Sequence, residues 1–177
     1  MFISMRRRTI WASAKRTKTL FSGMLTRSAA RTLTPSGMMI GAPSYRASDA
    51  IGVWVLTDDL HYTDAEYGSL GARAGLPTDG ASIPRLLWPI TGPPLRDWRV
   101  AGPAAIHDLL YYLAEQTRFS REDADIIFAR ALIANGVPTW KTLMYYIGVR
   151  LGGWVGWRRA KRETEFQARA KEWLIDG

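Results

Sequence analysis

Two short amphipathic segments, joined by a polar link, constrain the fold of this chain more than any other part of its sequence. The first spans about residues 103–114 and opens with a proline, which is favoured in the first turn of a helix. The second begins at Ser120, which has capping-box spacing with Asp123, and it ends near residue 135, just before a glycine. Because the link of residues 115–119 is short, we expect two antiparallel helices that pack side by side.

Each of these helices carries polar groups next to its apolar stripe. His107 and Tyr111 are four residues apart and share one face of the first helix, and Asp108 lies at the edge of that face. Asp125 borders the stripe of the second helix and can meet the face that carries His107 and Tyr111. The two stripes consist of Ile106, Leu109, Leu110 and Leu113 in the first helix and Ala124, Ile127, Phe128 and Ala131 in the second.

This combination of residues indicates acid–base chemistry. A carboxylate bonded to one imidazole nitrogen fixes the tautomer, so that the other nitrogen can take a proton from water. We therefore predict His107 as a general base oriented by Asp125, with Tyr111 donating a hydrogen bond to that carboxylate. Asp108 would point elsewhere and bind a hard cation together with backbone carbonyls. The alternative is structural, with a satisfied histidine and with Asp125 held in a buried network.

The spacing His107-Asp108-x-x-Tyr111, followed by Ala124-Asp125-x-x-Phe128, resembles the core of phospholipase A₂, especially the cysteine-free form of parvovirus capsid proteins. The resemblance implies a calcium-dependent ester hydrolase with His107, Asp125 and Tyr111 as catalytic residues and Asp108 as a calcium ligand. In that family a glycine-rich loop before the helix supplies further ligands. Its nearest equivalents here are the turn around Gly92 and the pair Ala101-Gly102, both without the doubled glycine spacing, and Asp79 is a candidate substitute ligand.

A second resemblance covers more of the chain, roughly residues 50–157. It rests on four motifs, which are Thr78-Asp79-Gly80-Ala81-Ser82-Ile83-Pro84, His107-Asp108-x-Leu110-Tyr111, Ser120-Arg121-x-x-Ala124-Asp125, and Val149-Arg150 before a pair of glycines. Together they resemble an uncharacterised family found in phages and prophages. This resemblance implies an origin rather than an activity.

The remaining sequence predicts few strands. Residues 53–57 are the best strand candidate, with a partner around residues 67–74 across a polar turn at 57–64. A third helix is expected over about residues 139–151, and a basic helix over about 158–174. The predicted fold class is therefore mainly α with a small β-hairpin, an α+β fold with a phospholipase A₂-like antiparallel helix pair at its core.

Charge is divided unevenly along the chain. Residues 1–46 hold nine Lys and Arg and no acidic residue, whereas residues 47–149 hold eight basic and 12 acidic residues. We predict a basic, unstructured arm or a mis-assigned start over residues 1–45, one globular domain over 46–157, and a basic C-terminal helix over 158–177. An acidic centre between basic, tryptophan-bearing ends favours an anionic phospholipid surface as partner.

Composition excludes several classes of site. The chain has no cysteine, which rules out disulfides, zinc–thiolate sites and cysteine nucleophiles. No run approaches the roughly 18 apolar residues of a membrane span, and no specific nucleic-acid motif is present. We expect a protein that is soluble or peripheral to a membrane.

Three functions follow from these observations. The first is a phospholipase A₂-like, calcium-dependent ester hydrolase. The second is a non-catalytic structural or accessory protein of a phage or prophage that keeps the helices as a scaffold. The third is a metal-dependent cell-wall hydrolase with Asp79, His107, Asp108 and Asp125 as metal ligands.

Overall fold

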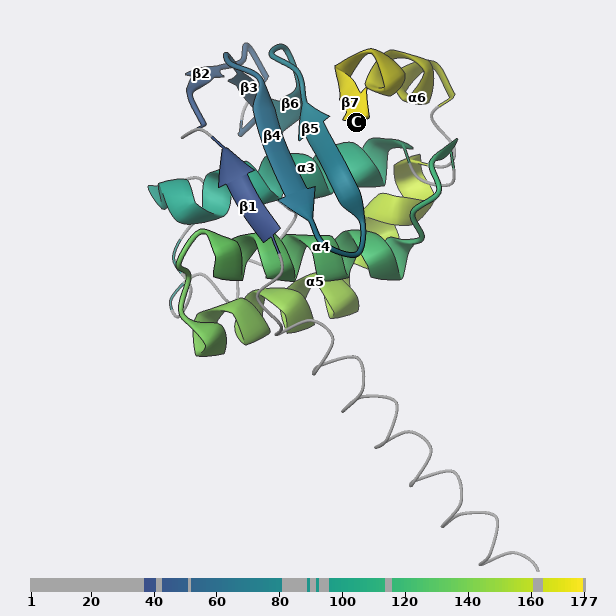
Figure 1. Ribbon diagram of the computed structural model, residues 1–177. Helices are drawn as coiled ribbons and strands as arrows, with labels where there is room; N and C mark the ends of the chain where they lie inside the picture. Colours follow the sequence, from purple (N-terminus) through teal and green to yellow (C-terminus); the bar gives the residue numbers. More distant parts are fainter. Residues whose placement is uncertain are drawn as a thin grey trace, which may run out of the picture. The chain divides into compact units, whose positions relative to one another are not determined.

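The computed structural model describes residues 37–40, 43–50, 52–80, 89, 92, 96–113, 116–160 and 164–176, all of which belong to one compact unit, Pro35–Gly177. Two antiparallel sheets in this unit pack on a group of helices (Figure 1). The buried core draws on strand residues such as Leu60 and Tyr62 and on helix residues such as Ile106 and Leu110.

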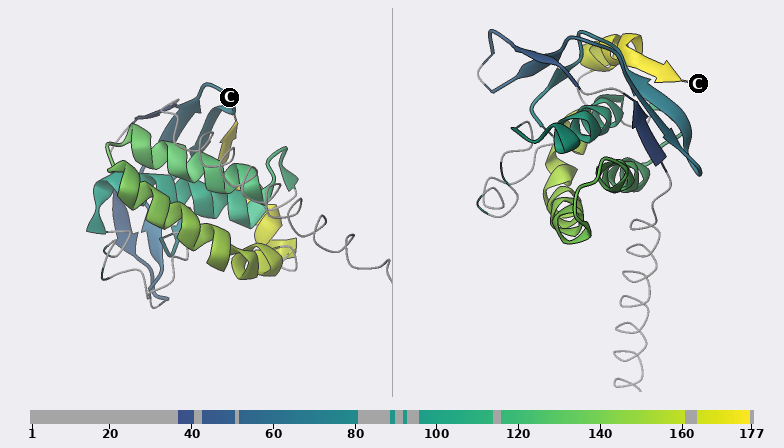
Figure 2. Two further views of the ribbon diagram at one scale, coloured as in Figure 1. Left: turned by 90° about the horizontal axis from the view of Figure 1, so that it is seen from below. Right: turned by 60° about the vertical axis from the view of Figure 1, so that its left-hand side comes forward.

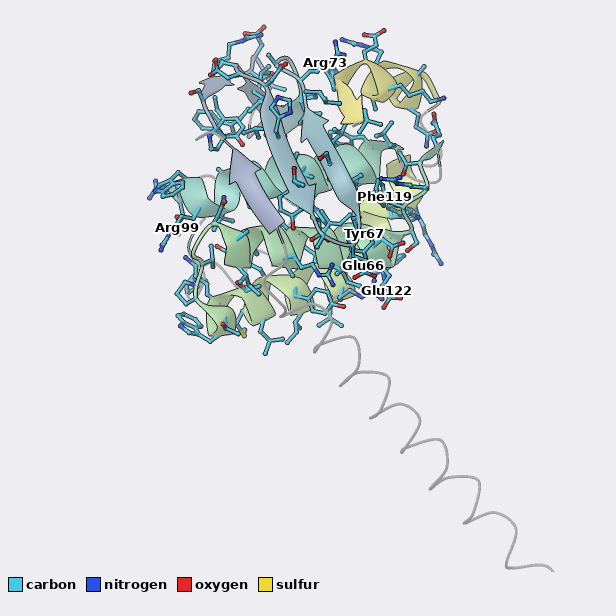
Figure 3. All side chains as sticks on the ribbon, in the orientation of Figure 1. Glu66, Tyr67, Arg73, Arg99, Phe119 and Glu122 are labelled. Atoms are coloured by element: carbon cyan, nitrogen blue, oxygen red, sulfur yellow. The ribbon has the colours of Figure 1, made fainter. Side chains whose placement is uncertain are left out.

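The larger sheet has four strands in the order β1-β4-β5-β7. Their bounds are Gly37–Ile40 (β1), Leu60–Asp64 (β4), Gly68–Ala72 (β5) and Leu174–Asp176 (β7). In β4, buried Leu60, Tyr62 and Asp64 alternate with exposed residues, so one face of the strand meets the core. The turn to β5 includes Glu66 and Tyr67, which Figure 3 labels beside α4. The Tyr67 hydroxyl donates to Asp123 of that helix and fixes the hairpin on it.

The smaller sheet has three strands in the order β2-β3-β6, with bounds Tyr45–Ala47 (β2), Trp54–Leu56 (β3) and Pro77–Thr78 (β6). Its last strand ends directly beside the helices. Proline opens β6 at the edge of the sheet, where a missing N–H is tolerated. The short strand delivers Thr78 to the interior, where its side chain is fully buried.

The central element is α3 (Trp98–Leu113), which is buried at 13 of its 16 residues. It packs against α4 (Arg121–Ala134), α5 (Thr139–Ala160) and α6 (Thr164–Ala170), and the strands cover another side, as Figure 2 shows. A 3-10 turn, Lys171–Trp173, then leads into β7. Because α3 is enclosed on most sides, polar groups on it are buried and need partners within the protein.

The predicted capping box of α4 is confirmed. The Ser120 side chain accepts a hydrogen bond from the backbone N–H of Asp123, and the Asp123 side chain accepts from the backbone N–H of Ser120. Residue 135 ends the helix, and Gly136 follows at φ +77°. The end of α4 lies beside the start of α3.

The first helix begins earlier than predicted, at Trp98 rather than near Pro103. A proline inside a helix removes the N–H that would bond to the carbonyl four residues before it, here that of Arg99. The Asn135 side-chain amide donates to this carbonyl at 3.1 Å. A neighbouring helix thus supplies the missing hydrogen bond, and the helix continues through the proline.

The predicted fold class is wrong. Instead of one small hairpin, the described residues form seven strands in two sheets. The expected phospholipase A₂-like core is also wrong, because α3 alone is the centre of a mixed α+β unit. Residues 57–64, predicted as a polar turn, contain β4, and β5 pairs with β4 rather than with β3. Short strands with exposed polar residues on one face look like turns when the sequence is read without their partners.

The C-terminal segment also differs from the expected continuous helix. The third helix runs on to Ala160, well past residue 151, and residues 174–176 form an edge strand paired with β5. The division into an arm, a domain and a terminal helix stays a prediction. None of the helices in the described part of the chain has the length and apolar character needed to cross a membrane.

Candidate active site

The candidate site is built on α3, one turn of which carries both His107 and Tyr111. Four-residue spacing stacks the two side chains, and their ring centroids lie 4.2 Å apart. On its other side the imidazole contacts the Phe128 ring of α4 at 5.0 Å between centroids. These contacts leave His107 only 1% exposed. The ring is therefore held in one orientation by packing.

Asp125 of α4 joins the pair and is completely buried. Its Oδ1 lies 2.9 Å from His107 Nε2 and accepts a hydrogen bond from the Tyr111 hydroxyl at 2.7 Å. Its Oδ2 accepts from Arg150 of α5 at 2.9 Å and from Arg121 at 3.5 Å. The structure thus brings together the three residues proposed as catalytic. It also places Arg121 on this carboxylate, which is one of the partners that a structural role of Asp125 would use.

The charges of this network set the direction of two pKa shifts. Burial lowers the pKa of His107, but the interactions with Asp108 and Asp125 outweigh burial and raise it above its usual value of 6.5. Burial raises the pKa of Asp125, and the hydrogen bonds from His107, Tyr111 and Arg150 outweigh it, so that the pKa lies below its usual value. The favoured state is an ionised carboxylate beside an imidazole that readily takes a proton.

The second ring nitrogen of His107 faces Asp108. Nδ1 lies 3.8 Å from Oδ1 of Asp108, beyond hydrogen-bond length, and it is a buried nitrogen with no hydrogen-bond partner within the described residues. The Asp108 Oδ2 atom accepts a hydrogen bond from the Thr78 hydroxyl at 2.5 Å. The Thr78 oxygen in turn accepts from the backbone N–H of Gly80. Asp108 is therefore buried and tied to the end of β6, rather than pointing away from the histidine.

The three residues proposed as metal ligands do not form a described cluster. Asp108 is buried, Asp79 is exposed, and Gly92 stands among residues outside the described part of the chain. Where the structure describes the chain, no group of three or more His, Asp or Glu side chains is arranged to hold a metal ion. The calcium site and the cell-wall-hydrolase metal centre therefore stay predictions.

Two site residues were not assigned roles from the sequence. Thr78 bonds to Asp108, and Arg150 bonds to Asp125 from a helix 25 residues further along the chain. Both belong to the motifs of the second resemblance, and these motifs were the sequence feature that could have pointed to them. Their partners depend on how β6 and α5 pack against α3 and α4, which local periodicity does not encode.

The fold and the site together define an α+β protein with a buried histidine–aspartate–tyrosine network at its centre. The chain belongs to the family described as Protein of unknown function (DUF1353), which matches residues 54–149. This match includes α3 and α4 with all three residues of the network.

Among curated proteins, the chain is similar to "Uncharacterized protein y4jT" of Sinorhizobium fredii (strain NBRC 101917 / NGR234). The two are 30% identical over 119 residues, which cover 67% of this chain and 32% of that protein. The chain thus spans about a third of the length of this relative. No solved structure matches this chain.

Proposed function

We propose that this protein is a hydrolase of phospholipid esters in which His107 is the general base. The observation that carries the proposal is the asymmetric environment of the imidazole. One ring nitrogen is fixed on a buried carboxylate, and the other has no hydrogen-bond partner among the described residues. A satisfied structural histidine would use both nitrogens, whereas a base needs one of them for a proton.

In the proposed reaction, water loses a proton to Nδ1 of His107 while its oxygen forms a bond to the ester carbonyl carbon. Asp125 stabilises the imidazolium that results, and Tyr111 holds Asp125 in place. When the tetrahedral intermediate collapses, the carbon–oxygen bond to the leaving alcohol breaks. The proton then passes from His107 to that oxygen, which restores the neutral imidazole.

Calcium remains part of the proposal only as a condition of the assay. The phospholipase resemblance assigns Asp108 to the cation, and this carboxylate lies next to the proposed base. A hard cation bound there would supply charge stabilisation to the developing oxyanion. The steps above do not depend on it.

A second candidate function is supported by the burial of the network. With His107 1% exposed and Asp125 fully buried, the residues also suit a scaffold that needs no access to water. The protein would then be a non-catalytic structural or accessory protein, with a phage or prophage origin as the further proposal. The match to one third of a longer relative is compatible with such a module.

Release of fatty acid from mixed phospholipid vesicles separates the two candidates. The assay is run with calcium and with a chelator, on the natural protein, on His107→Ala, and on His61→Ala as a matched control, since His61 is the chain's other histidine and is exposed on β4. We expect release by the natural protein and the control, and none by His107→Ala. Absence of release in both conditions, from a folded natural protein, overturns the hydrolase and favours the scaffold.

A further inference from the structure

The most unusual surface of the molecule is the outer face of α5. Of the seven large hydrophobic side chains that are exposed among the described residues, five lie on this helix. They are Trp140, Ile147, Leu151, Trp154 and Val155, with exposed fractions between 41% and 72%. Their spacing of three, four and seven residues places them along one side of the helix. Together they span about four turns of one side of the helix, and we call them the α5 stripe.

The side of α5 opposite the stripe makes the contacts of this helix with the core. Tyr145 and Val149 of α5 are buried against α3 and α4, and Gly153 lies against the Tyr111 ring. Arg150, between the two faces, reaches Asp125. The helix is therefore fixed in rotation by the site itself, and the apolar stripe is held outward.

The charge of α5 limits what can cover the stripe. Residues 139–160 contain four basic residues, Lys141, Arg150, Arg158 and Arg159, and no acidic residue. Arg158 is exposed, and its guanidinium lies over the Trp154 ring at 4.9 Å from the centroid. Lys141 is paired with Asp97 and Arg150 with Asp125, so Arg158 is the described cation of α5 that stands unpaired beside the stripe. A second copy of this face would add another Arg158 and no acidic side chain of α5 to pair with it, whereas an anionic surface would be attracted by this charge.

From these observations we propose that the α5 stripe docks on an anionic phospholipid surface. Apolar residues flanked by tryptophan and arginine are the composition of helices that lie in the membrane interface. Trp140 and Trp154 stand near the two ends of the stripe, where their rings would sit at the level of the head groups. The helix would lie flat on the surface, with its packed side toward the protein.

This inference rests on the proposed function and deepens it, because the docking helix is also part of the site. The same helix carries the stripe on its outer face and Arg150, the partner of Asp125, toward the interior. Docking through α5 would hold the His107 network one helix away from the lipid surface. The substrate class implied is an anionic phospholipid in a bilayer rather than a dispersed ester.

The test is co-sedimentation with two kinds of vesicle, one zwitterionic and one containing an anionic phospholipid. We compare the natural protein with Leu151→Glu and the milder Trp154→Ala. Trp54→Ala is the matched control, because Trp54 is an exposed tryptophan on β3, away from α5. We expect anionic vesicles to bind the natural protein and the control, and both stripe variants to bind them at least about tenfold more weakly. Circular dichroism checks that each variant is folded.

Two further measurements test the hydrolase and the docking surface separately. They are vesicle binding by His107→Ala and hydrolysis of a soluble short-chain ester. If His107→Ala binds vesicles normally and no variant hydrolyses any ester, the proposed function fails and the docking surface stands. If Leu151→Glu loses activity on vesicles but keeps it on the soluble ester, both are supported.

Two results overturn the docking proposal. One is equal binding to anionic and zwitterionic vesicles, or no binding to either. The other is a natural protein that is dimeric by light scattering and becomes monomeric in Leu151→Glu, which would assign the stripe to a second copy.

Discussion

Two buried carboxylates of this protein are held by similar partners, one in a sheet and one between helices. Asp64, at the end of β4, accepts hydrogen bonds from the Tyr62 hydroxyl at 2.8 Å and from Arg130 at 3.0 Å. It also accepts from the backbone N–H groups of Glu66 and Tyr67. This set ties the β4–β5 turn to α4 through permanent donors.

Asp125 likewise binds a tyrosine and an arginine, Tyr111 and Arg150, but it also contacts His107. Of the groups that surround the two carboxylates, this imidazole is the one with a usual pKa near neutrality. The comparison separates the partners that any buried carboxylate needs from a partner that burial alone does not require. Tyrosine and arginine occur in both sets, and only the histidine adds a proton that can move.

The largest difference is expected when each carboxylate becomes an amide. Asp125→Asn should lower kcat for phospholipid hydrolysis by about 10²- to 10⁴-fold, the usual contribution of general acid–base catalysis, because an amide does not stabilise the imidazolium. Asp64→Asn should leave kcat per folded molecule unchanged. Fatty-acid release, normalised to the folded fraction, measures both. Equal losses would mean that the two carboxylates have the same structural role.

When the arginine partners are replaced, the larger effect is expected at Asp64 rather than at Asp125, and it is an effect on stability. Arg130 is almost fully buried and binds both Asp64 and Glu66, so Arg130→Met should lower the free energy of unfolding by about 3–5 kcal/mol. Arg150 is partly exposed, and Asp125 keeps His107 and Arg121 without it, so Arg150→Met should lose only about 1 kcal/mol. Urea denaturation measures the two values. A larger loss for Arg150→Met would contradict this order.

Two glycines of α5 give a matched pair at the site. A methyl group at Gly153 would overlap the Tyr111 hydroxyl, whereas one at Gly156 would lie 3.7 Å from Cδ1 of the same ring, an ordinary contact. Gly153→Ala should destabilise the protein by about 1–3 kcal/mol and lower activity by displacing Tyr111 from Asp125. Gly156→Ala should be near neutral, since alanine favours a helix. Thermal unfolding and the vesicle assay distinguish them, and equal effects would show that the close approach is unimportant.

The smallest effects are expected from pH. The raised pKa of His107 means that its contribution to stability is full below 6.5 and is lost as pH rises through the folded pKa. The lowered pKa values of Asp125 and Asp64 give contributions that are full above 3.8 and are lost as pH falls through the folded values. Between pH 6.5 and the titration of the tyrosines near pH 10, only the His107 network should therefore weaken as pH rises.

Because the neutral imidazole is the base, hydrolysis should rise with pH above 6.5. Unfolding by urea at several pH values, for the natural protein and for His107→Gln, tests the stability, and a pH–rate profile tests the activity. A stability difference between the two proteins that grows above pH 6.5, or a rate that falls there, would contradict the assignment.

The sequence predicted the helices well and the sheets poorly, for reasons that particular residues illustrate. The Ser120–Asp123 capping box and the glycine after residue 135 act within one turn, so they locate α4 without tertiary context. The shared face of His107 and Tyr111 follows from helical spacing alone. By contrast, β4 presents Leu60 and Tyr62 inward and His61 outward, a pattern too short to distinguish from a turn until β1 and β5 pair with it.

By itself, the sequence determined the α4 capping box and the shared helix face of His107 and Tyr111, because hydrogen bonds and side-chain periodicity within a helix are local. Only the tertiary structure decided that Arg150 and Thr78 join the His107 network, that Asp108 turns inward, and that α5 presents an apolar stripe. Those contacts join segments 25 and 30 residues apart. Their partners are set by how helices and strands pack, and packing depends on the whole core rather than on any one segment.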